Sequence, residues 1–488
     1  MIKKKAVILT LTGVMTLTGL FSTVPVLSSS HLVFASPNEN AAVAFDKKVL
    51  SRIQSEKSME HIRQLSVEIG ERVAGMQGEK TAAEYIKKQL EEYGYDVTVQ
   101  EFNIADRKLG HLLIPSLSDK FIPVSTPAQS ASTIESGLKG TFMAAGFGAI
   151  DQIPEEVAGN IAVIERGGGL TFVQKVQNAV AAGATGVVIY DNVESLSPIN
   201  PSLTGYTSPI PVVGIMKKDG EKLVSQLANQ QVEGTVTVNQ YSNLKSQNLI
   251  VSRKPNNKNK DSQQIVHVTA HYDSVPNSPG ANDNASGTSV LLEFARILKA
   301  YPIDKEVRFV FFGAEEIGLV GSRYYVNQLS QDEIDRSIAN FNMDMVGTAW
   351  PNATMLYVNT VDGNSNIVFE SAQAAGARLD NHTTFLYKRG ASDHVPFYEA
   401  GIPSANFIRR EAVTASLEPY YHTPSDTIEN ISQSRIQEAG EIIGSALYDV
   451  LRTKNPSLTQ SKVRRTEAEM APFYDPENFN HDHDGVKE

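Results

Sequence analysis

Two adjacent glutamates, Glu315 and Glu316, come just after a largely apolar stretch that runs from Val307 to Phe312. Neighbouring carboxylates repel each other, and gathering them in a cleft is costly unless cations compensate their charge. Because neighbouring side chains of an extended chain point in opposite directions, one glutamate could bind a metal while the other moves a proton. The pair therefore indicates either a solvated surface or a metal ligand beside a catalytic base.

Further residues that could do chemistry lie where apolar stretches end or in turns: His271, Asp273, Asp283, Asp344 and His422. Taken singly, each also has a structural interpretation, such as polar surface, a helix cap for Asp283 or a turn for Asp344. The carboxyl ends of the strands in an open α/β sheet form a common crevice, so we expect these side chains to converge.

Two histidines, two aspartates and one glutamate make a ligand set that suits zinc. Two divalent cations would remove the repulsion among the carboxylates. A zinc pair that shares a bridging carboxylate lowers the pKa of bound water toward about 7, and a free carboxylate can then take the proton. Asp273 lies two residues from His271, on the same side of the chain, and could orient its imidazole. The residues predict metal-assisted hydrolysis.

The elements that must position these residues alternate between strand and helix along the second half of the chain. Apolar runs predict strands at 264–270, 307–314, 337–344, 354–360 and 404–408, and helical spacing predicts helices at 285–301, from Ile367 onward and at 434–452. A helix is also predicted at 78–94 and a strand at 95–102. Near-continuous apolar strands alternating with helices predict an α/β sheet covered on both faces.

Residues 136–240 show a separate pattern of predicted elements. Short apolar runs flank a predicted helix from Phe172 and a predicted strand at 186–190. The triple glycine at 167–169 predicts a plain turn, because the Lys-Ser/Thr pair of a phosphate loop does not follow it. Residues 111–135 are rich in Pro, Ser and Thr, which is typical of a linker.

Composition narrows the class of protein. Three lysines near the N-terminus, an apolar stretch from Ala6 to Leu20 and VFA ending at Ala35 predict an export signal; an uncleaved anchor is the alternative. We therefore expect a secreted, extracellular protein.

The absence of cysteine excludes disulfides, thiolate metal sites and cysteine nucleophiles. A net charge of -11 and a pI of about 5.5 argue against a nucleic-acid partner.

The motifs AHYDS, GANDNASG, GAEEIGLVGS, NMDMVG, SDHVPF and YHTPSDT resemble those of the secreted, leucyl-type co-catalytic dizinc aminopeptidases. They occur in order between about residues 260 and 450, and residues 59–110 are similar to that family's opening helices. GNIAVIERGG and AAGATGVVIYDN resemble the protease-associated (PA) domain that is often inserted there. The resemblance implies an α/β fold, with a mixed, mostly parallel sheet, helices on both faces and an inserted, smaller, β-rich PA domain.

On this basis the chain divides into a signal peptide (1–35), two parts of a peptidase domain (41–125 and 241–455), an inserted PA domain (126–240) and a polar tail (456–488). The tail includes the stretch from His481 to Asp484, which is interpreted as solvated rather than metal-binding. The inserted domain could be a structural lid or could gate substrate, and the sequence favours neither.

The resemblance also implies a role for each candidate residue. One zinc ion would be held by His271 and Asp344 and a second by Glu316 and His422. Asp283 would bridge the two ions, with its peptide bond to Asn284 in cis.

Other roles follow from the same resemblance. Glu315 would be the general base and Asp273 would orient the neighbouring ligand. Tyr421 would donate to the oxyanion, with Tyr420 as its rival. Asp393 and His394 would support the ligands, although Ser392 or Asp393 could equally cap a helix.

The resemblance implies a metallo-aminopeptidase that uses two Zn²⁺ ions per chain to hydrolyse N-terminal residues from peptides. Expected partners are peptides with a free N-terminus; nucleic acid and, after processing, membrane are not expected, and the chain is taken as a monomer. One alternative is a zinc carboxypeptidase, for which the adjacent Arg409 and Arg410 could clamp a carboxylate. Another is an inactive binding ectodomain, which would be expected to have lost ligands or the base.

Overall fold

The computed structural model describes residues 46–47, 50–452 and 461–471 of the 488-residue chain. The predicted export signal and the stretch from His481 to Asp484 lie outside these residues. Within them the chain forms an eight-stranded and a six-stranded sheet. Among the described residues, no helix combines the length and the apolar character that crossing a bilayer requires.

The eight-stranded sheet carries the candidate site, and its strand order is β1-β8-β10-β9-β11-β14-β12-β13. Strands β10, β9, β11 and β14 run parallel, as do β12 and β13, whereas β8 is antiparallel to β10 and β12 to β14. The predicted mixed, mostly parallel sheet is therefore confirmed. The strands are β1 (Thr98–Asn103), β8 (Lys245–Arg253), β9 (Ile265–His271), β10 (Glu306–Phe312), β11 (Ser337–Met343), β12 (Met355–Thr360), β13 (Thr384–Lys388) and β14 (Ser404–Arg410).

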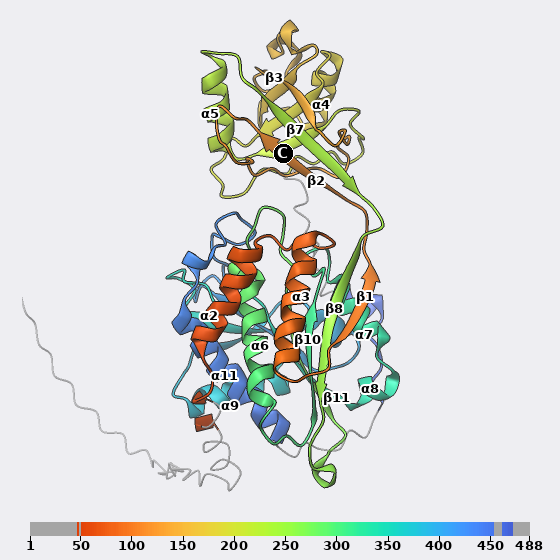
Figure 1. The fold of residues 1–488 in the computed structure, drawn as a ribbon, viewed down its shortest axis with the longest axis vertical. Helices are drawn as coiled ribbons and strands as arrows, with labels where there is room; N and C mark the ends of the chain where they lie inside the picture. Colours follow the sequence, from red (N-terminus) through yellow and green to blue (C-terminus); the bar gives the residue numbers. More distant parts are fainter. Residues whose placement is uncertain (1–45, 48–49, 453–460, 472–488) are drawn as a thin grey trace, which may run out of the picture. The chain divides into compact units, whose positions relative to one another are not determined.

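Helices cover both faces of this sheet, as its apolar strands predicted. Phe309 and Phe311 of β10 belong to the main core with one group of helices, whereas Val310 and Phe312 pack with the other group. The first group, seen beside the sheet in Figure 1, is α2 (Ser55–Arg63), α3 (Gln77–Glu92), α6 (Gly287–Leu298), α9 (Ile367–Arg378) and α11 (Gln433–Arg452). The second is α7 (Val320–Gln328), α8 (Gln331–Arg336) and α10 (His394–Glu399). Burial on both faces explains why β9, β11 and β14 are buried along their whole length.

The six-stranded sheet has the order β2-β7-β3-β4-β5-β6 and has its own core. Its elements are β2 (Arg107–Leu113), β3 (Leu138–Ala144), β4 (Ile161–Glu165), α4 (Phe172–Ala181), β5 (Gly186–Tyr190), β6 (Val212–Ile215), α5 (Lys217–Leu227) and β7 (Glu233–Tyr241). The first residues of the predicted linker, 111–113, are the end of β2. Strand β2 pairs along its whole length with β7. The three glycines at 167–169 all have positive φ angles, which confirms the predicted turn.

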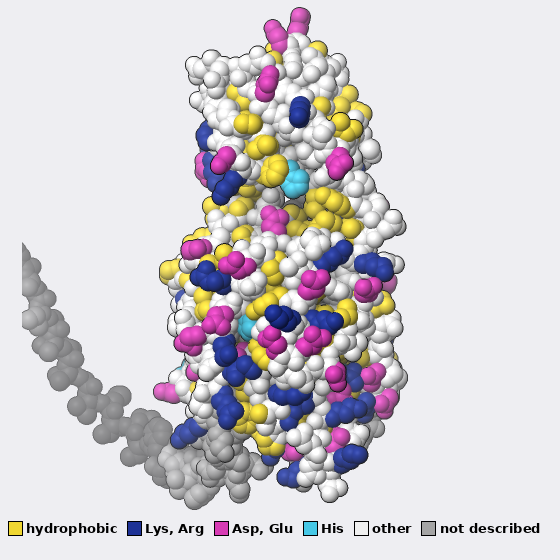
Figure 2. Space-filling model, viewed as in Figure 1, with side chains coloured by type: hydrophobic (Ala, Val, Ile, Leu, Met, Phe, Trp, Pro, Cys, Tyr) yellow, Lys and Arg dark blue, Asp and Glu magenta, His cyan; other side chains and the backbone are white. Residues whose placement is uncertain are grey.

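Residues 461–471 were assigned to a polar tail, yet they pack against the rest of the chain. They include the short helix α12 (Glu467–Met470), and Met470 is buried beside Leu319, Val361 and Val395. On the face shown in Figure 2, acidic and basic side chains are interspersed over the surface.

Candidate metal centre and active site

The carboxyl ends of three parallel strands bring most of the candidate residues together. His271 is the last residue of β9, Asp344 directly follows β11, and Glu315 and Glu316 lie in the turn after β10. Asp283 comes from the segment Ala281–Ser286 just ahead of α6, where its own backbone is non-helical, and His422 comes from the loop between β14 and α11. All six side chains are between 1 and 9 % exposed.

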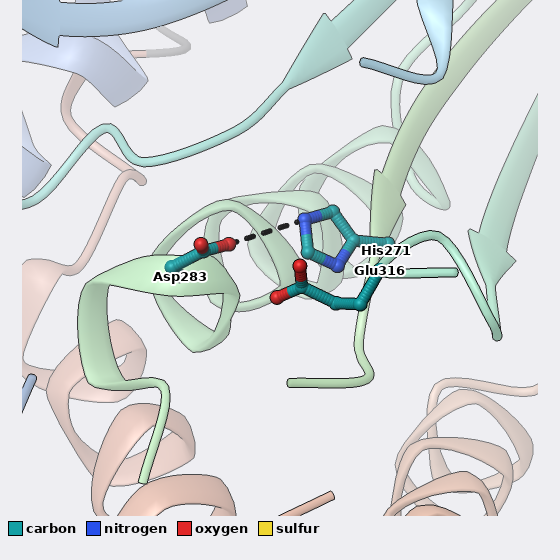
Figure 3. Close-up of side chains that lie close together, drawn as sticks. All are labelled: His271, Asp283 and Glu316. Carbon is teal, nitrogen blue, oxygen red and sulfur yellow. Dashed lines mark ion pairs between the residues drawn. The ribbon is translucent and has the colours of Figure 1, made fainter. Parts of the chain in front are cut away.

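The two imidazoles share the carboxylate of Asp283. His271 Nε2 lies 3.3 Å from Asp283 Oδ1, and His422 Nε2 lies 3.1 Å from Asp283 Oδ2. The same nitrogen atoms each approach a second carboxylate: His271 Nε2 lies 3.4 Å from Asp344 Oδ1, and His422 Nε2 lies 3.1 Å from Glu316 Oε2. Figure 3 shows His271, Asp283 and Glu316 converging from three separate segments. Asp283 thus presents one oxygen to each histidine, as a bridging ligand would.

This donor set fits zinc. Zinc–ligand bonds of about 2.1 Å place neighbouring ligand atoms of a tetrahedron about 3.4 Å apart, close to the separations between these imidazole and carboxylate atoms. Ligand atoms of His271, Asp283 and Glu316, and those of His271, Glu315 and Asp344, also lie within 4.8 Å of one another. The nitrogen and carboxylate oxygens are borderline and hard ligands, and zinc accepts both.

Electrostatics at the two histidines favours positive charge. Burial acts to lower the pKa of His271, but the carboxylates of Glu315 and Asp344 outweigh it and raise the pKa well above the usual range. Burial is likewise outweighed at His422, where Glu316 and Asp283 raise the pKa to about 10. Divalent cations bound among these groups would likewise be stabilised by the negative charge of the carboxylates.

The glutamate pair reaches the site from a turn, so the expected extended geometry is wrong. The backbone N–H groups of Gly318 and Leu319 both donate to the carbonyl of Glu315, and Ala314 has a φ of 56°. Glu315 Oε2 lies 4.0 Å from His271 Nε2, whereas Glu316 lies beside the second histidine. The turn therefore directs the two carboxylates to different histidines.

Asp273 connects His271 with that turn. Its Oδ1 lies 3.4 Å from His271 Nδ1 and accepts a hydrogen bond of 3.1 Å from the backbone N–H of Glu315. Its Oδ2 accepts a bond of 3.2 Å from the N–H of Glu316. One buried carboxylate therefore lies beside the imidazole and also fixes the backbone of both glutamates.

The backbone around Asp283 is held by residues that the sequence analysis missed. Asp426 accepts hydrogen bonds from the N–H groups of Asn282 and Asp283 at 2.7 and 3.0 Å, and Glu418 accepts one from the Asn282 side chain at 2.6 Å. The peptide bond between Asp283 and Asn284 is cis, as predicted. Asp426 is part of the YHTPSDT motif, and that proximity was the available signal.

Two residues of the N-terminal segment also support the rim of the site and were missed. Arg72 is fully buried and donates to the carbonyls of Tyr272 and Gly280, close to His271 and Asp283. Glu79 accepts from the N–H of Ala314 at 3.1 Å, just before the glutamate pair. Neither residue belongs to a local motif, so the sequence carried no signal for them.

The two candidate tyrosines are placed differently. The ring of Tyr421 stacks on that of His422, with centroids 3.7 Å apart. Burial raises the pKa of Tyr421 well above the usual range, and the nearby charges of Asp283 and Glu316 add to the increase. Tyr420 contributes its backbone carbonyl, which accepts a hydrogen bond from Thr423. The surroundings of Tyr421 thus include the carboxylates of the site.

Asp393 and His394 are fully buried close to the same groups. Burial raises the pKa of Asp393 to about 7, and burial lowers that of His394 to about 4. Asp393 makes no side-chain capping bond to α10, and the hydroxyl of Ser392 instead accepts a bond from Asn342. The alternative of helix capping by Ser392 or Asp393 is therefore wrong.

A cavity of about 460 Å³ opens beside Glu316 and His422. It is also lined by residues 103–109, 124–129 and several positions between 197 and 204, which include parts of the six-stranded sheet and its connections. The hydroxyl of Ser197 donates to the carbonyl of His422 at 3.0 Å. Residues of the inserted segment therefore contact the loop that carries a candidate ligand.

Zinc stoichiometry tests the second half of this centre. We expect the wild-type protein to retain two zinc ions after dialysis and His422→Ala to retain about one, because His422 is proposed to bind only one of the ions. Elemental analysis gives the zinc content per chain. His382→Ala, which removes an exposed histidine beside Asp380, is the control and should retain two. Two ions in His422→Ala would show that His422 is not a ligand.

Comparisons with known proteins give a consistent picture. The profile of peptidase family M28 matches residues 248–447, and that of the PA domain matches residues 127–223. The chain is 48% identical over 407 residues to aminopeptidase YwaD of Bacillus subtilis. The aligned region covers 83% of this chain and 87% of the relative.

Solved structures agree with the sequence comparisons. The structure of BSAP, a zinc aminopeptidase from Bacillus subtilis, matches with a TM-score of 0.65 at 47% identity, over 84% of this chain and 98% of that one. An aminopeptidase from Aneurinibacillus sp. strain AM-1 matches with a TM-score of 0.57 at 34% identity, over 86% and 100% of the two chains.

Proposed function

The chain belongs to peptidase family M28, and we propose that it is a zinc-dependent aminopeptidase that hydrolyses N-terminal residues from peptides. The observation that carries the proposal is the shared carboxylate of Asp283, which offers one oxygen to His271 and the other to His422. Asp344 and Glu316 complete the two ligand pairs. A relative that is 47% identical over most of its length is described as a zinc aminopeptidase, which supports the same activity here.

When bound, two zinc ions would supply Lewis-acid activation of a water molecule at neutral pH. Glu315 then serves as the base that takes the proton of the attacking water and later gives it to the leaving amine. Burial raises the pKa of Glu315 well above its usual range, with partial opposition from His271. A raised pKa suits this role, because it makes the carboxylate a stronger base for the proton of the attacking water.

Two further residues position or stabilise the reacting groups. Asp273 holds the imidazole of His271 and, through two backbone hydrogen bonds, keeps Glu315 and Glu316 in their turn. The hydroxyl of Tyr421 donates to the oxyanion that forms at the scissile carbonyl. Its stacking on His422 and its proximity to the carboxylates of the site support Tyr421 over Tyr420.

The predicted export signal supports a secreted enzyme, which acts as a monomer on peptides with a free N-terminus. Neither nucleic acid nor, after processing, membrane is a partner. The cavity beside Glu316 and His422 is partly lined by residues 197–204, so the inserted PA domain forms one wall of the route to the site. This arrangement supports substrate gating rather than a purely structural lid.

The carboxypeptidase alternative loses part of its basis. Arg409 donates to Glu438 at 2.6 Å and to the carbonyls of Val346 and Arg435, so it is engaged inside the protein rather than available as a substrate clamp. An inactive ectodomain is disfavoured because the proposed ligands and the proposed base are all present.

Cleavage of small substrates tests the proposed function. We expect leucine p-nitroanilide to be hydrolysed, the activity to disappear with a chelator and zinc to restore it, while N-acetyl-leucine p-nitroanilide is not hydrolysed. Absorbance of released p-nitroaniline measures both rates. Hydrolysis of N-blocked peptides from their C-terminal end, without activity on leucine p-nitroanilide, would instead establish a carboxypeptidase.

A further inference from the structure

Arg389 and Arg410 are neighbouring arginines that form no ion pair among the described residues. Arg410 is 6 % exposed; its Nη1 donates to the carbonyl of Ala415 at 2.8 Å, and its guanidinium carbon lies 5.9 Å from the ring centre of Tyr387. The buried Nε of Arg410 makes no hydrogen bond, and neither does the buried Nε of Arg389. Each guanidinium therefore has an unused donor, and neither forms an ion pair with a described carboxylate.

Several other arginines of this chain have acidic partners, whereas the fully buried Arg72 bonds to backbone carbonyls instead. Arg409 bonds to Glu438, Arg308 to Glu306 and Arg378 to Asp46, each at 2.6 Å. An acidic partner or a set of carbonyl acceptors is the usual arrangement, because an uncompensated buried charge is costly. Arg389 and Arg410 have neither an ion pair with a described carboxylate nor a bond to Nε, so they leave donors available to an anion from outside the chain.

The position of Arg410 connects it to the catalytic rim. It is the last residue of β14, which runs parallel to β11, and Asp344 directly follows β11. The backbone N–H of Asp344 donates to Phe407 at 3.0 Å, and the N–H of Arg409 donates to Met345 at 3.0 Å. The end of β14 is thus hydrogen-bonded directly to the segment that carries a proposed ligand.

An apolar wall lies between Arg410 and the ligands. It is a small cluster in which Met345 follows Asp344 in sequence and Tyr421 precedes His422. Its described members are Met345, Met355, Tyr357, Tyr387, Ile408, Ala415, Leu417 and Tyr421. The strand register places Ile408, Tyr357 and Phe385 opposite one another on the same face of the sheet. The wall therefore reaches from both ligand pairs to the ring beneath Arg410.

Electrostatic coupling agrees with this placement. Burial lowers the pKa of Arg410 to about 10, and the positive charge of Arg389 adds to the decrease. Tyr387, Tyr421 and Asp344 act in the opposite direction. The guanidinium of Arg410 is therefore within electrostatic range of Arg389 on one side and of the catalytic rim on the other.

We infer that Arg389 and Arg410 form a subsite that binds a carboxylate of the peptide substrate, at the end of the apolar wall. Paired guanidinium groups provide several charge-assisted donors and match the planar geometry of a carboxylate. The carboxylate is either the acidic side chain of the N-terminal residue or the C-terminal carboxylate of a very short peptide. The inference rests on the proposed aminopeptidase function and adds a substrate preference to it.

Matched pairs of substrates test the subsite. Glutamyl and glutaminyl p-nitroanilide differ in the side-chain carboxylate, and Leu-Gly and Leu-Gly amide differ in the terminal one. The acid-to-amide ratio of kcat/KM is measured for each pair in the wild type, Arg389→Gln, Arg410→Gln and Arg410→Lys. Because each ratio is formed within one protein preparation, a change in the folded or zinc-loaded fraction cancels.

We expect at least one of the two ratios to fall about tenfold in each Arg→Gln variant, and less in Arg410→Lys, which keeps the charge. The pair whose ratio falls identifies the source of the carboxylate. Lys388→Gln removes an exposed cation beside Arg389 and is the control; its ratios should match the wild type.

Two results would overturn the subsite. One is a pair of ratios that stays unchanged in both Arg→Gln variants, and the other is an equal fall in Lys388→Gln. Leucine p-nitroanilide carries no carboxylate. If the wild type still hydrolyses it, either result rejects the subsite but leaves the proposed aminopeptidase function standing. Failure of the wild type on leucine p-nitroanilide would instead reject the proposed function.

Discussion

Replacing Glu315 with glutamine is expected to lower kcat by about 10²- to 10⁴-fold, the usual contribution of a general base or acid. Glutamine has nearly the same shape but cannot accept the proton of the attacking water. Glu315 is 1 % exposed, and its carboxylate lies 4.0 Å from His271 Nε2. Because Glu315 is proposed to remain free of the metal, the variant should retain two zinc ions.

Glu316→Gln is the matched control, since it makes the same chemical change at the neighbouring position. Glu316 Oε2 lies 3.1 Å from His422 Nε2, so its replacement should reduce zinc content as well as turnover. Stopped assays with leucine p-nitroanilide give kcat, and elemental analysis gives zinc per chain. If Glu315→Gln lost zinc while Glu316→Gln kept it, the two roles would be reversed.

Replacing Arg72 with methionine is expected to lower the free energy of unfolding by about 3–5 kcal/mol, as when one member of a buried polar network is removed. Arg72 donates to the carbonyls of Leu65, Gly70, Tyr272, Pro279 and Gly280. Methionine fills much of the volume but leaves these buried acceptors without their donor. The carboxylates of Asp273 and Asp283 would also lose a nearby positive charge.

Urea unfolding, followed by circular dichroism with zinc present, measures this loss. Arg63→Met is the control, because Arg63 is an exposed arginine near the end of α2, where a change of about 0.5 kcal/mol or less is expected. Equal stabilities of the Arg72 and Arg63 variants would show that the Arg72 network contributes little to the fold.

The sequence predicted the peptidase fold well where strands are buried on both faces. The apolar runs that became β9, β10, β11 and β14 are nearly continuous, because helices cover both sides of the sheet. Two strands of the same sheet were missed. β8 mixes polar and apolar residues, and β13 has an exposed Phe385, so neither shows the pattern of a central strand.

The candidate ligands were predictable for a related reason. His271, Asp344 and the glutamate pair each follow an apolar strand, so that strand prediction also places the side chains at one edge. Arg72 could not be found this way, because its partner Tyr272 is 200 residues distant in the chain. The turn at Ala314 was missed for a similar reason, since it depends on bonds to Asp273 and Glu79.

Anomalous diffraction at the zinc absorption edge tests the central claim most directly. Crystals of the zinc-loaded protein should show two peaks, one bounded by His271, Asp283 and Asp344 and the other by Asp283, Glu316 and His422, with Glu315 outside both coordination shells. A single peak, peaks elsewhere in the chain, or Glu315 bound directly to zinc would contradict the proposed centre.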